Sequence, residues 1–114
     1  MKEKRREKVL AGDTHEINTS CGSLLVTVNK SEGKVFEVFA RLGKAGGCPS
    51  CQLEALARSI STGLRAGVEL EEYAHTLIGL RCHQPSFSNG DQINSCPDAI
   101  AQVLKLYTGE ATVA

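Results

Sequence analysis

Residues 24–41 read LLVTVNKSEGKVFEVFAR, and this stretch decides which fold the chain can adopt. Two runs rich in β-branched and aromatic residues, Leu24–Val28 and Val35–Arg41, flank Asn29–Lys34, which supplies turn residues and a glycine. Such runs around a glycine-containing loop are typical of a β-hairpin. The sequence therefore predicts a hairpin here, and Asp13–Thr19 predicts a short edge strand before it.

The apolar pattern changes from strand to helix after Gly47. One helical stripe is formed by Leu53, Leu56, Ala57, Ile60 and Leu64. Gly67 stands where a left-handed cap would end this helix. Leu70–Ile78 predicts a second helix, residues 79–94 a polar loop, and Ile100–Tyr107 a third helix. Because strands come first and helices follow, we expect an α+β fold, with about three helices packed on a small antiparallel, hairpin-based sheet.

Length and charge limit the possible classes of protein. A chain of 114 residues fits one domain, which we assign to residues 12–108, between a basic, flexible N-terminus at 1–11 and a C-terminal tail at 109–114. The 13 basic and 13 acidic side chains cancel, so nucleic acid is not an expected partner. No apolar segment is long enough for a membrane span or for the core of a secretory signal. We therefore expect a cytoplasmic protein without a membrane partner.

The five cysteines are the residues most suggestive of chemistry. In a reducing compartment they indicate metal ligands or redox groups before they indicate disulfides. Cys48 and Cys96 each stand directly before a proline at a predicted helix start. Proline is tolerated at the first helical position, so the cysteine is predicted as the N-cap, where free N–H groups and the helix dipole stabilise a thiolate. Other residue types cap helices better, so we expect these thiols to serve another purpose.

Two further cysteines lie in comparable positions. Cys21 precedes Gly22 at the mouth of a strand, and Cys82 follows the second predicted helix. Side chains from four element ends could converge, and four thiolates around one ion give the tetrahedral geometry of structural zinc. The spacing matches no short zinc-finger pattern, and buried, unreactive cysteines are the plainer alternative.

The order of these motifs resembles the TSCPD domain family. The resemblance covers about residues 14–107 and rests on Cys21–Asn29, Phe36–Phe39, Gly43–Cys48, Gly79–Cys82 and Ser95–Ile100. It departs from the family at Asn94, where threonine is expected. The family includes small stand-alone proteins and the C-terminal region of adenosylcobalamin-dependent, class II ribonucleotide reductases. The catalytic barrel of those enzymes has no counterpart here.

The resemblance implies a four-cysteine site made of Cys21, Cys48, Cys82 and Cys96, with Zn²⁺ as the expected ion. It implies an accessory domain linked to deoxynucleotide synthesis, with a reductase catalytic subunit or a nucleotide as partner. A more distant likeness connects the chain to the U-type iron–sulfur cluster scaffold proteins. In that comparison Cys21, Cys48 and Cys96 match the three ligands, Cys82 is additional, and an iron–sulfur cluster is the alternative cofactor.

Other interpretations of the motifs remain open. Cys48 and Cys51 form a C-x-x-C dithiol at a helix start, which would suit a redox module, although no thioredoxin-like βαβ pattern precedes it. Gly43–Gly47 could cradle an anion or simply let the backbone turn tightly toward Cys48. His83 could replace a thiolate as ligand. No nucleophile–base–acid set is recognisable, so we expect no catalytic activity of the domain alone.

Overall fold

The hairpin predicted for residues 24–41 supplies the central strand and one edge strand of the main sheet. The computed structural model of the chain describes residues 5–43, 47–88 and 90–108. Strand β2 (Gly22–Ser31) lies between β1 (Ala11–Thr19) and β3 (Lys34–Leu42), and all neighbours are antiparallel. A bulge between Asn29 and Lys30 shifts the register near the hairpin end, whereas Val38–Leu42 pairs regularly with residues 24–28. The predicted hairpin and edge strand are confirmed, each extending a few residues further than the apolar pattern.

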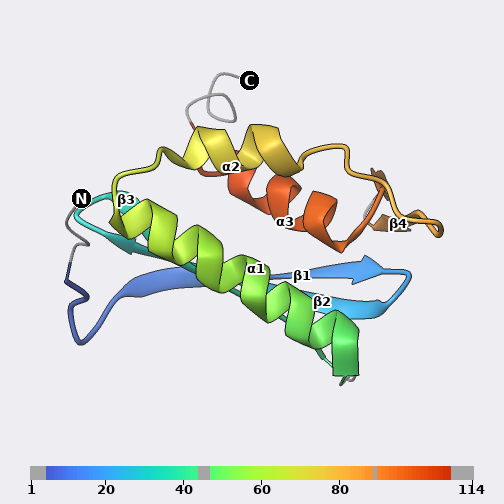
Figure 1. Ribbon diagram of the computed structural model, residues 1–114, viewed down its shortest axis with the longest axis horizontal. Helices are drawn as coiled ribbons and strands as arrows, with labels where there is room; N and C mark the ends of the chain where they lie inside the picture. The colour runs from blue at the N-terminus through green and yellow to red at the C-terminus, as the bar shows by residue number, and fades with distance from the viewer. Residues whose placement is uncertain (1–4, 44–46, 89, 109–114) are drawn as a thin grey trace.

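Helix α1 (Gly47–Arg65) lies against β3, and the shorter helices α2 (Leu70–Leu77) and α3 (Cys96–Lys105) pack on each other. Figure 1 shows α1 running diagonally across the sheet, with α2 and α3 beside it on the same side. Gly67 has a φ of +105°, a conformation in which glycine ends α1 without strain. The predicted α+β class, with a small antiparallel sheet and three helices in the described residues, is confirmed.

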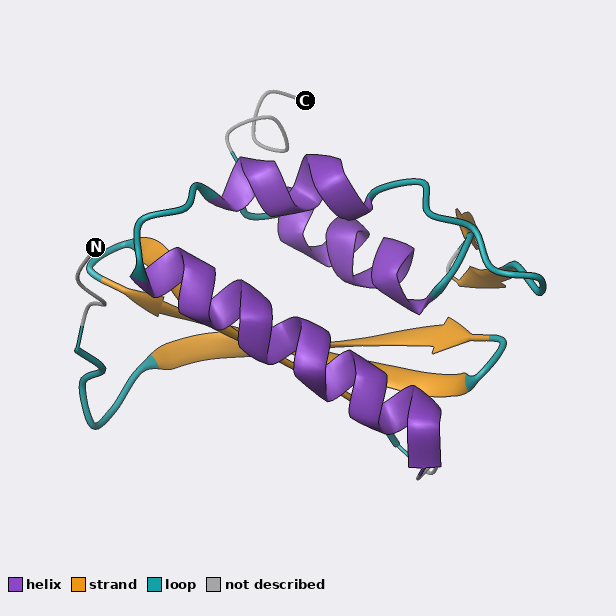
Figure 2. Cartoon of the chain, in the orientation of Figure 1, coloured by secondary structure: helices purple, strands orange, loops and turns teal. Residues whose placement is uncertain are grey.

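The loop predicted for residues 79–94 contains a second, two-stranded antiparallel sheet. Its strands are β4 (Ser86–Ser88) and β5 (Asp91–Ile93), visible beyond the start of α3 in Figure 2. The Ser86 hydroxyl donates to the Asn18 carbonyl at 3.3 Å, and the Asn18 N–H donates to the Ser88 hydroxyl at 3.2 Å, so this ribbon is attached to the end of β1. The prediction of an irregular loop was wrong here because three-residue polar strands carry no apolar alternation.

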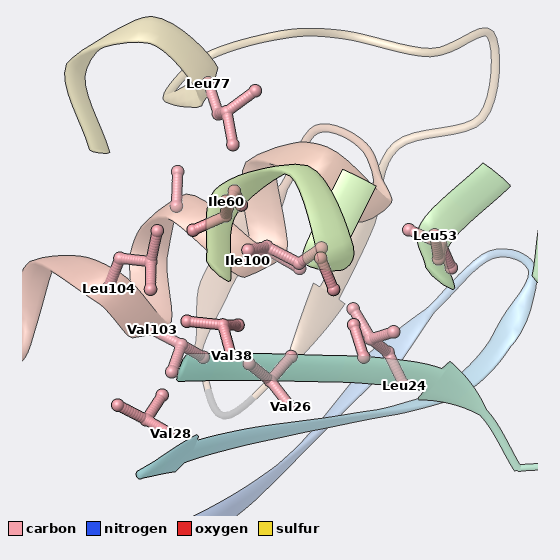
Figure 3. Packing of buried hydrophobic residues seen from close by; sticks show 14 of the residues in the cluster. Leu24, Val26, Val28, Val38, Leu53, Ile60, Leu77, Ile100, Val103 and Leu104 are labelled. Atoms are coloured by element: carbon pink, nitrogen blue, oxygen red, sulfur yellow. The ribbon is translucent and has the colours of Figure 1, made fainter. Parts of the chain in front are cut away.

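The core lies between the sheet and the three helices. On β2, Leu24, Val26 and Val28 are fully buried, while their neighbours Leu25 and Thr27 are half-buried on the opposite face. Strand side chains alternate between faces, so this pattern orients β2 with one face toward the helices. Figure 3 shows the β2 residues together with side chains from the helices, including Leu53, Ile60, Ile100 and Leu104.

The open face of the sheet carries a buried ion pair near the bulge. Glu37 is only 1% exposed, and its carboxylate accepts from the Arg6 guanidinium at 2.8 and 3.0 Å and from the Asn29 amide at 2.7 Å. The bond from Arg6 keeps the pKa of Glu37 below its usual value, although burial acts in the opposite direction. Part of the basic N-terminal run, expected to be a flexible terminus, therefore contributes an ordered contact to the sheet.

A second polar link joins the end of α3 to β1. The Tyr107 hydroxyl donates to the Asp13 carboxylate at 2.9 Å and lies 2.7 Å from Nε2 of His15. Burial, together with the hydrogen bond to Asp13, raises the pKa of Tyr107 to about 12. The phenol therefore keeps its proton to higher pH than an exposed tyrosine does, and it links the end of α3 to the first strand.

Helix α1 also covers part of the outer edge of β3. The Ser61 hydroxyl accepts from the Val38 N–H at 2.9 Å and donates to the Val38 carbonyl at 2.9 Å. Both residues are almost fully buried, so one serine side chain replaces the strand that is missing at this edge. Covering an edge in this way removes a template for unwanted pairing with another chain.

Replacing Ser61 by alanine should lower the free energy of unfolding by about 1–3 kcal/mol, because a buried N–H and a buried carbonyl lose their partner. Urea unfolding of the variant and the parent protein measures this difference. Ser59→Ala is the matched control, since the Ser59 hydroxyl is exposed and donates only to the Ala55 carbonyl of its own helix. Equal effects of the two substitutions would contradict a role for Ser61 at the strand edge.

Candidate functional site

Three of the predicted cysteine ligands line one cavity of about 430 Å³. Cys21 lies in the turn between β1 and β2, Cys82 follows α2, and Cys96 occupies the first turn of α3. The rest of the wall is mostly apolar and comes from the start of α1, the end of α2 and the start of α3, and it includes Pro49, Leu53, Leu56, Leu77, Leu80 and Pro97. Segments far apart in the sequence therefore bring their thiols to a common apolar depression.

The Thr19 hydroxyl connects the first and the last of these cysteines. It accepts from the Cys21 N–H at 3.2 Å and lies 3.5 Å from the Cys96 thiol, which donates to it. The same hydroxyl donates to the Gly22 carbonyl at 2.9 Å. Gly22 has a φ of +130°. A residue with a side chain would be strained in this conformation. The β1–β2 turn is thus shaped so that Cys21 lies beside the start of α3.

The main-chain N–H and the sulfur of Cys82 both form hydrogen bonds with main-chain groups of other residues. Its N–H donates to the Asn94 carbonyl at 2.9 Å, which ties the loop after α2 to the segment before α3. Its sulfur accepts from the Gln84 N–H at 3.4 Å. A main-chain N–H directed at sulfur stabilises negative charge on it. These two bonds hold the half-buried Cys82 beside the segment that precedes α3.

The N-cap of α3 is Ser95, not Cys96. The Ser95 hydroxyl accepts from the Asp98 N–H at 3.1 Å and donates to the Leu80 carbonyl at 2.6 Å. The predicted arrangement, with cysteine as the cap and proline directly after it as the first helical residue, was wrong for this helix. Serine is the stronger cap, and it moves Cys96 into the first turn, where the helix dipole still acts on the sulfur.

Asp98 is the polar centre of this region. Its carboxylate is 1% exposed and accepts from the Gly79 N–H at 2.7 Å, the Asn94 N–H at 2.9 Å and the Gln102 side-chain amide at 2.9 Å. One buried carboxylate thus joins the segment that leads to Cys82 with the segment that leads to Cys96. Gly79 and Asn94 lie outside α3, so the pattern of the helix alone does not predict this link across segments.

The electrostatic surroundings of Cys96 show how near the other thiols are. Burial raises the pKa of the Cys96 thiol most, and the hydrogen bond to Thr19 partly offsets this. Repulsion from Cys21, a hydrogen bond with the Cys21 thiol and repulsion from Cys82 raise it further. The charges of both neighbouring thiols therefore influence Cys96.

The other predicted candidates lie apart from the cavity or outside the described residues. Cys51 and His83 are exposed, and neither lines the cavity. The side chain of Cys48 lies outside the described residues, although its neighbour Pro49 contributes to the wall. The suggested anion cradle at Gly43–Gly47 falls on residues 44–46, which the structure does not describe.

The sequence model of the TSCPD domain matches residues 1–108 of this chain. The chain belongs to the TSCPD-domain family. Members of this family are associated with ribonucleotide reductase, and the match includes the N-terminal residues that pack on the sheet. No curated protein and no solved structure matches the chain.

Residues 94–98 correspond to the short motif after which the TSCPD domain is named, and the structure gives these residues distinct roles. In residues 94–98 the main-chain N–H of Asn94 is bonded to Asp98, Ser95 caps the helix, Cys96 faces the cavity and Pro97 lines it. The sequence analysis had singled out the cysteine and the proline. It missed Thr19 and the links made by Ser95 and Asp98, because their partners lie many residues away in the chain.

The thiols of this TSCPD domain are side chains of the type that binds metal ions. In the described residues, however, they do not form a complete set of ligands around one point. Thiolate sulfur is a common ligand of structural zinc, and three thiols share one cavity. Within residues 5–43, 47–88 and 90–108, no three His, Cys, Asp or Glu side chains form a group that could hold an ion. None of the described helices has the length and apolar character needed to span a bilayer.

Proposed function

We propose that this TSCPD domain binds one metal ion, Zn²⁺, through Cys21, Cys48, Cys82 and Cys96. The observation that carries the proposal is that three of these thiols line one cavity, where the Thr19 hydroxyl links Cys21 to Cys96. Pro49 in the same wall supports a fourth ligand from the start of α1. When bound, the ion would supply a rigid link between segments that the sequence places far apart.

The residues around the thiols have supporting roles in this proposal. Thr19 fixes the turn that carries Cys21, and the Gln84 N–H stabilises the sulfur of Cys82. Asp98 does not line the cavity, but its carboxylate joins the segments that lead to Cys82 and Cys96. Polar partners of this kind orient ligands and raise their affinity for an ion.

The domain would act as an accessory module of deoxynucleotide synthesis in the cytoplasm. Its membership of a family associated with ribonucleotide reductase supports this role. A reductase catalytic subunit is the expected partner, with a nucleotide as the second candidate.

Elemental analysis of the purified protein tests the metal site. We expect about one zinc per chain, and we expect Cys96→Ser to lose most of it because Cys96 is one of the three thiols that line the cavity. Removal of the metal with a chelator should also lower the melting temperature, since the ion stabilises only the folded chain.

Cys51→Ser is the matched control for this experiment. Cys51 is exposed on α1 and lies outside the cavity, so the variant should keep its zinc. Zinc retained in a folded Cys96→Ser variant would contradict the ligand assignment. Iron with a brown colour would instead favour a cluster scaffold, and a metal-free protein with a reversible Cys48–Cys51 disulfide would favour a dithiol redox module.

A further inference from the structure

The outer edge of β1 carries main-chain groups that point away from the sheet. At Asn18 the N–H donates to the Ser88 hydroxyl and the carbonyl accepts from the Ser86 hydroxyl, so both groups of this residue point away from β2. The direction of these groups alternates along an antiparallel strand. Because β1 pairs regularly with β2 over its whole length, three residues nearer its start also point outward. These residues are Gly12, Thr14 and Glu16.

This part of the edge is accessible. Gly12, Thr14 and Glu16 are all exposed, and no described residue forms a hydrogen bond with their outward main-chain groups. The β4–β5 ribbon bonds to the edge at Asn18, near the arrowhead of β1 in Figure 1. The opposite edge of the sheet differs, because Ser61 covers it. An exposed strand edge is a template for pairing with another strand.

A groove beside this edge leaves room for the side chains of an added strand. It has a volume of about 240 Å³ and lies between β1 and α3. His15 and Ile17 line it from the strand, and Val103 and Leu106 line it from the helix. Leu106 is 57% exposed, so it offers an apolar surface there. Because residues opposite each other in an antiparallel pair project to the same face, an added strand would direct alternate side chains into this groove.

The sequence of β1 is complementary to itself in one antiparallel register. When Thr14 lies opposite Thr14 of a second copy, Gly12 lies opposite Glu16 of that copy. All three outward-pointing residues of each strand then have a partner, and each such pair exchanges both N–H···O bonds. The threonine pair at the centre joins two β-branched residues, which suit a pleated sheet.

The side chains on the helix side of the strand are also matched in this register. Asp13 lies opposite His15 of the second copy, and His15 lies opposite Asp13. Within each chain the Tyr107 hydroxyl uses only Oδ2 of Asp13 and Nε2 of His15. In the described residues Oδ1 of Asp13 and Nδ1 of His15 have no partner, so each is available for a bond to the other copy.

The two neighbouring registers fit less well. A shift that places Thr14 opposite Glu16 of the second copy would place Gly12 opposite Asn18, whose main-chain groups the ribbon already occupies. The opposite shift places Asp13 opposite Asp13 of the second copy. Like charges directly opposite each other are destabilising.

We propose that two copies of this chain associate through their β1 edges, with Thr14 opposite Thr14, and so form one continuous antiparallel sheet. The contact is isologous, so each bond between the copies occurs twice. Ala11 and Asp13 of the second copy enter the groove beside Leu106. The proposal goes beyond the metal-binding role and does not depend on it.

Sedimentation equilibrium and amide exchange test this dimer in the parent protein. Between about 10 µM and about 1 mM chain, a range that covers weak to moderate affinities, we expect the average mass to double. Over the same range the exchange of the Gly12, Thr14 and Glu16 amides with solvent should slow, because their outward N–H groups become hydrogen-bonded. The amides of Asp13 and His15 point toward β2 and are the internal control, since their exchange should change little.

Thr14→Pro makes the test specific to the main chain. Proline is tolerated where the N–H of an edge strand points outward, so the variant should keep the bonds between β1 and β2. It should weaken the dimer by at least about tenfold, because both copies lose a hydrogen bond at the centre of the contact. Thr14→Val is the matched control, since it keeps the N–H and should dimerise as the parent protein does. Thermal unfolding checks that both variants are folded.

Three results would overturn the proposal. The first is a parent protein that remains monomeric at about 1 mM, which would leave the edge to a different partner or to none. The second is a dimer in which the slowed amides lie outside Gly12, Thr14 and Glu16. The third is a folded Thr14→Pro variant with the same dissociation constant as Thr14→Val. If Thr14→Pro does not fold, amide exchange in the parent protein still decides.

Discussion

Replacement of Asp98 by alanine should lower the free energy of unfolding by about 3–5 kcal/mol. The buried carboxylate accepts from the main-chain N–H groups of Gly79 and Asn94 and from the Gln102 amide. Without it, main-chain donors lose their partner, and each orphaned buried group costs about 1–3 kcal/mol. Chemical denaturation of the variant and the parent protein measures the loss.

Gln102→Ala is the control for this prediction. It removes one donor but leaves the carboxylate bonded to the main chain, so we expect a loss of only about 0.5–1.5 kcal/mol. Asp98→Asn should keep most of the large effect, because an amide cannot accept at both positions. If Asp98→Ala were no more harmful than Gln102→Ala, Asp98 would not join the segments of Cys82 and Cys96.

Replacement of Ile100 by alanine should lower the free energy of unfolding by about 2–5 kcal/mol, because it leaves a cavity at a fully buried position. Ile100 is 0% exposed and lies on the face of α3 that meets the core. Figure 3 shows its side chain among those of Ile60, Val38 and Val26, which come from α1 and the sheet. Thermal or urea unfolding tests the prediction, since a domain of this size has only about 5–15 kcal/mol of stability.

Leu106→Ala is the matched control at the end of the same helix. Leu106 is 57% exposed, so its truncation should change the stability by no more than about 0.5 kcal/mol. A comparable loss from both substitutions would contradict the placement of Ile100 in the core, because alanine itself favours the helix.

The thiol cavity and the β3 edge are two separate surfaces of this TSCPD domain. The cavity gathers its cysteines from the β1–β2 turn, from the loop after α2 and from the first turn of α3. The β3 edge is bordered instead by the middle of α1, near Ala57 and Ser61. The stability test at Ser61 and the metal test at Cys96 therefore address different parts of the fold.

Much of the fold could be predicted because its pattern is local. The β-branched, apolar run from Leu24 to Val28, followed by turn residues, indicates a strand of a hairpin. The stripe from Leu53 to Leu64 indicates a helix in the same way. Strands β4 and β5 could not be predicted, because Ser86–Ser88 and Asp91–Ile93 are too short and polar to show a period.

The candidate site was predictable only in its residue types. Cys21, Cys82 and Cys96 stand at element ends, which sequence analysis recognised, and the structure brings them to one cavity. Their role as metal ligands stays a prediction, as does that of Cys48. The contribution of Thr19 was missed, because a threonine hydroxyl that bonds two distant segments leaves no local signal.

The sequence by itself determined the α+β class, the central hairpin, the helix positions and the cysteines worth testing. These features follow from the spacing of apolar residues and from the backbone preferences of glycine and proline, which act over a few neighbouring residues. Only the tertiary structure decided that Asp98 joins two loops and that Ser61 covers the β3 edge at Val38. Hydrogen bonds between distant segments depend on how elements pack, and packing is a property of the whole chain.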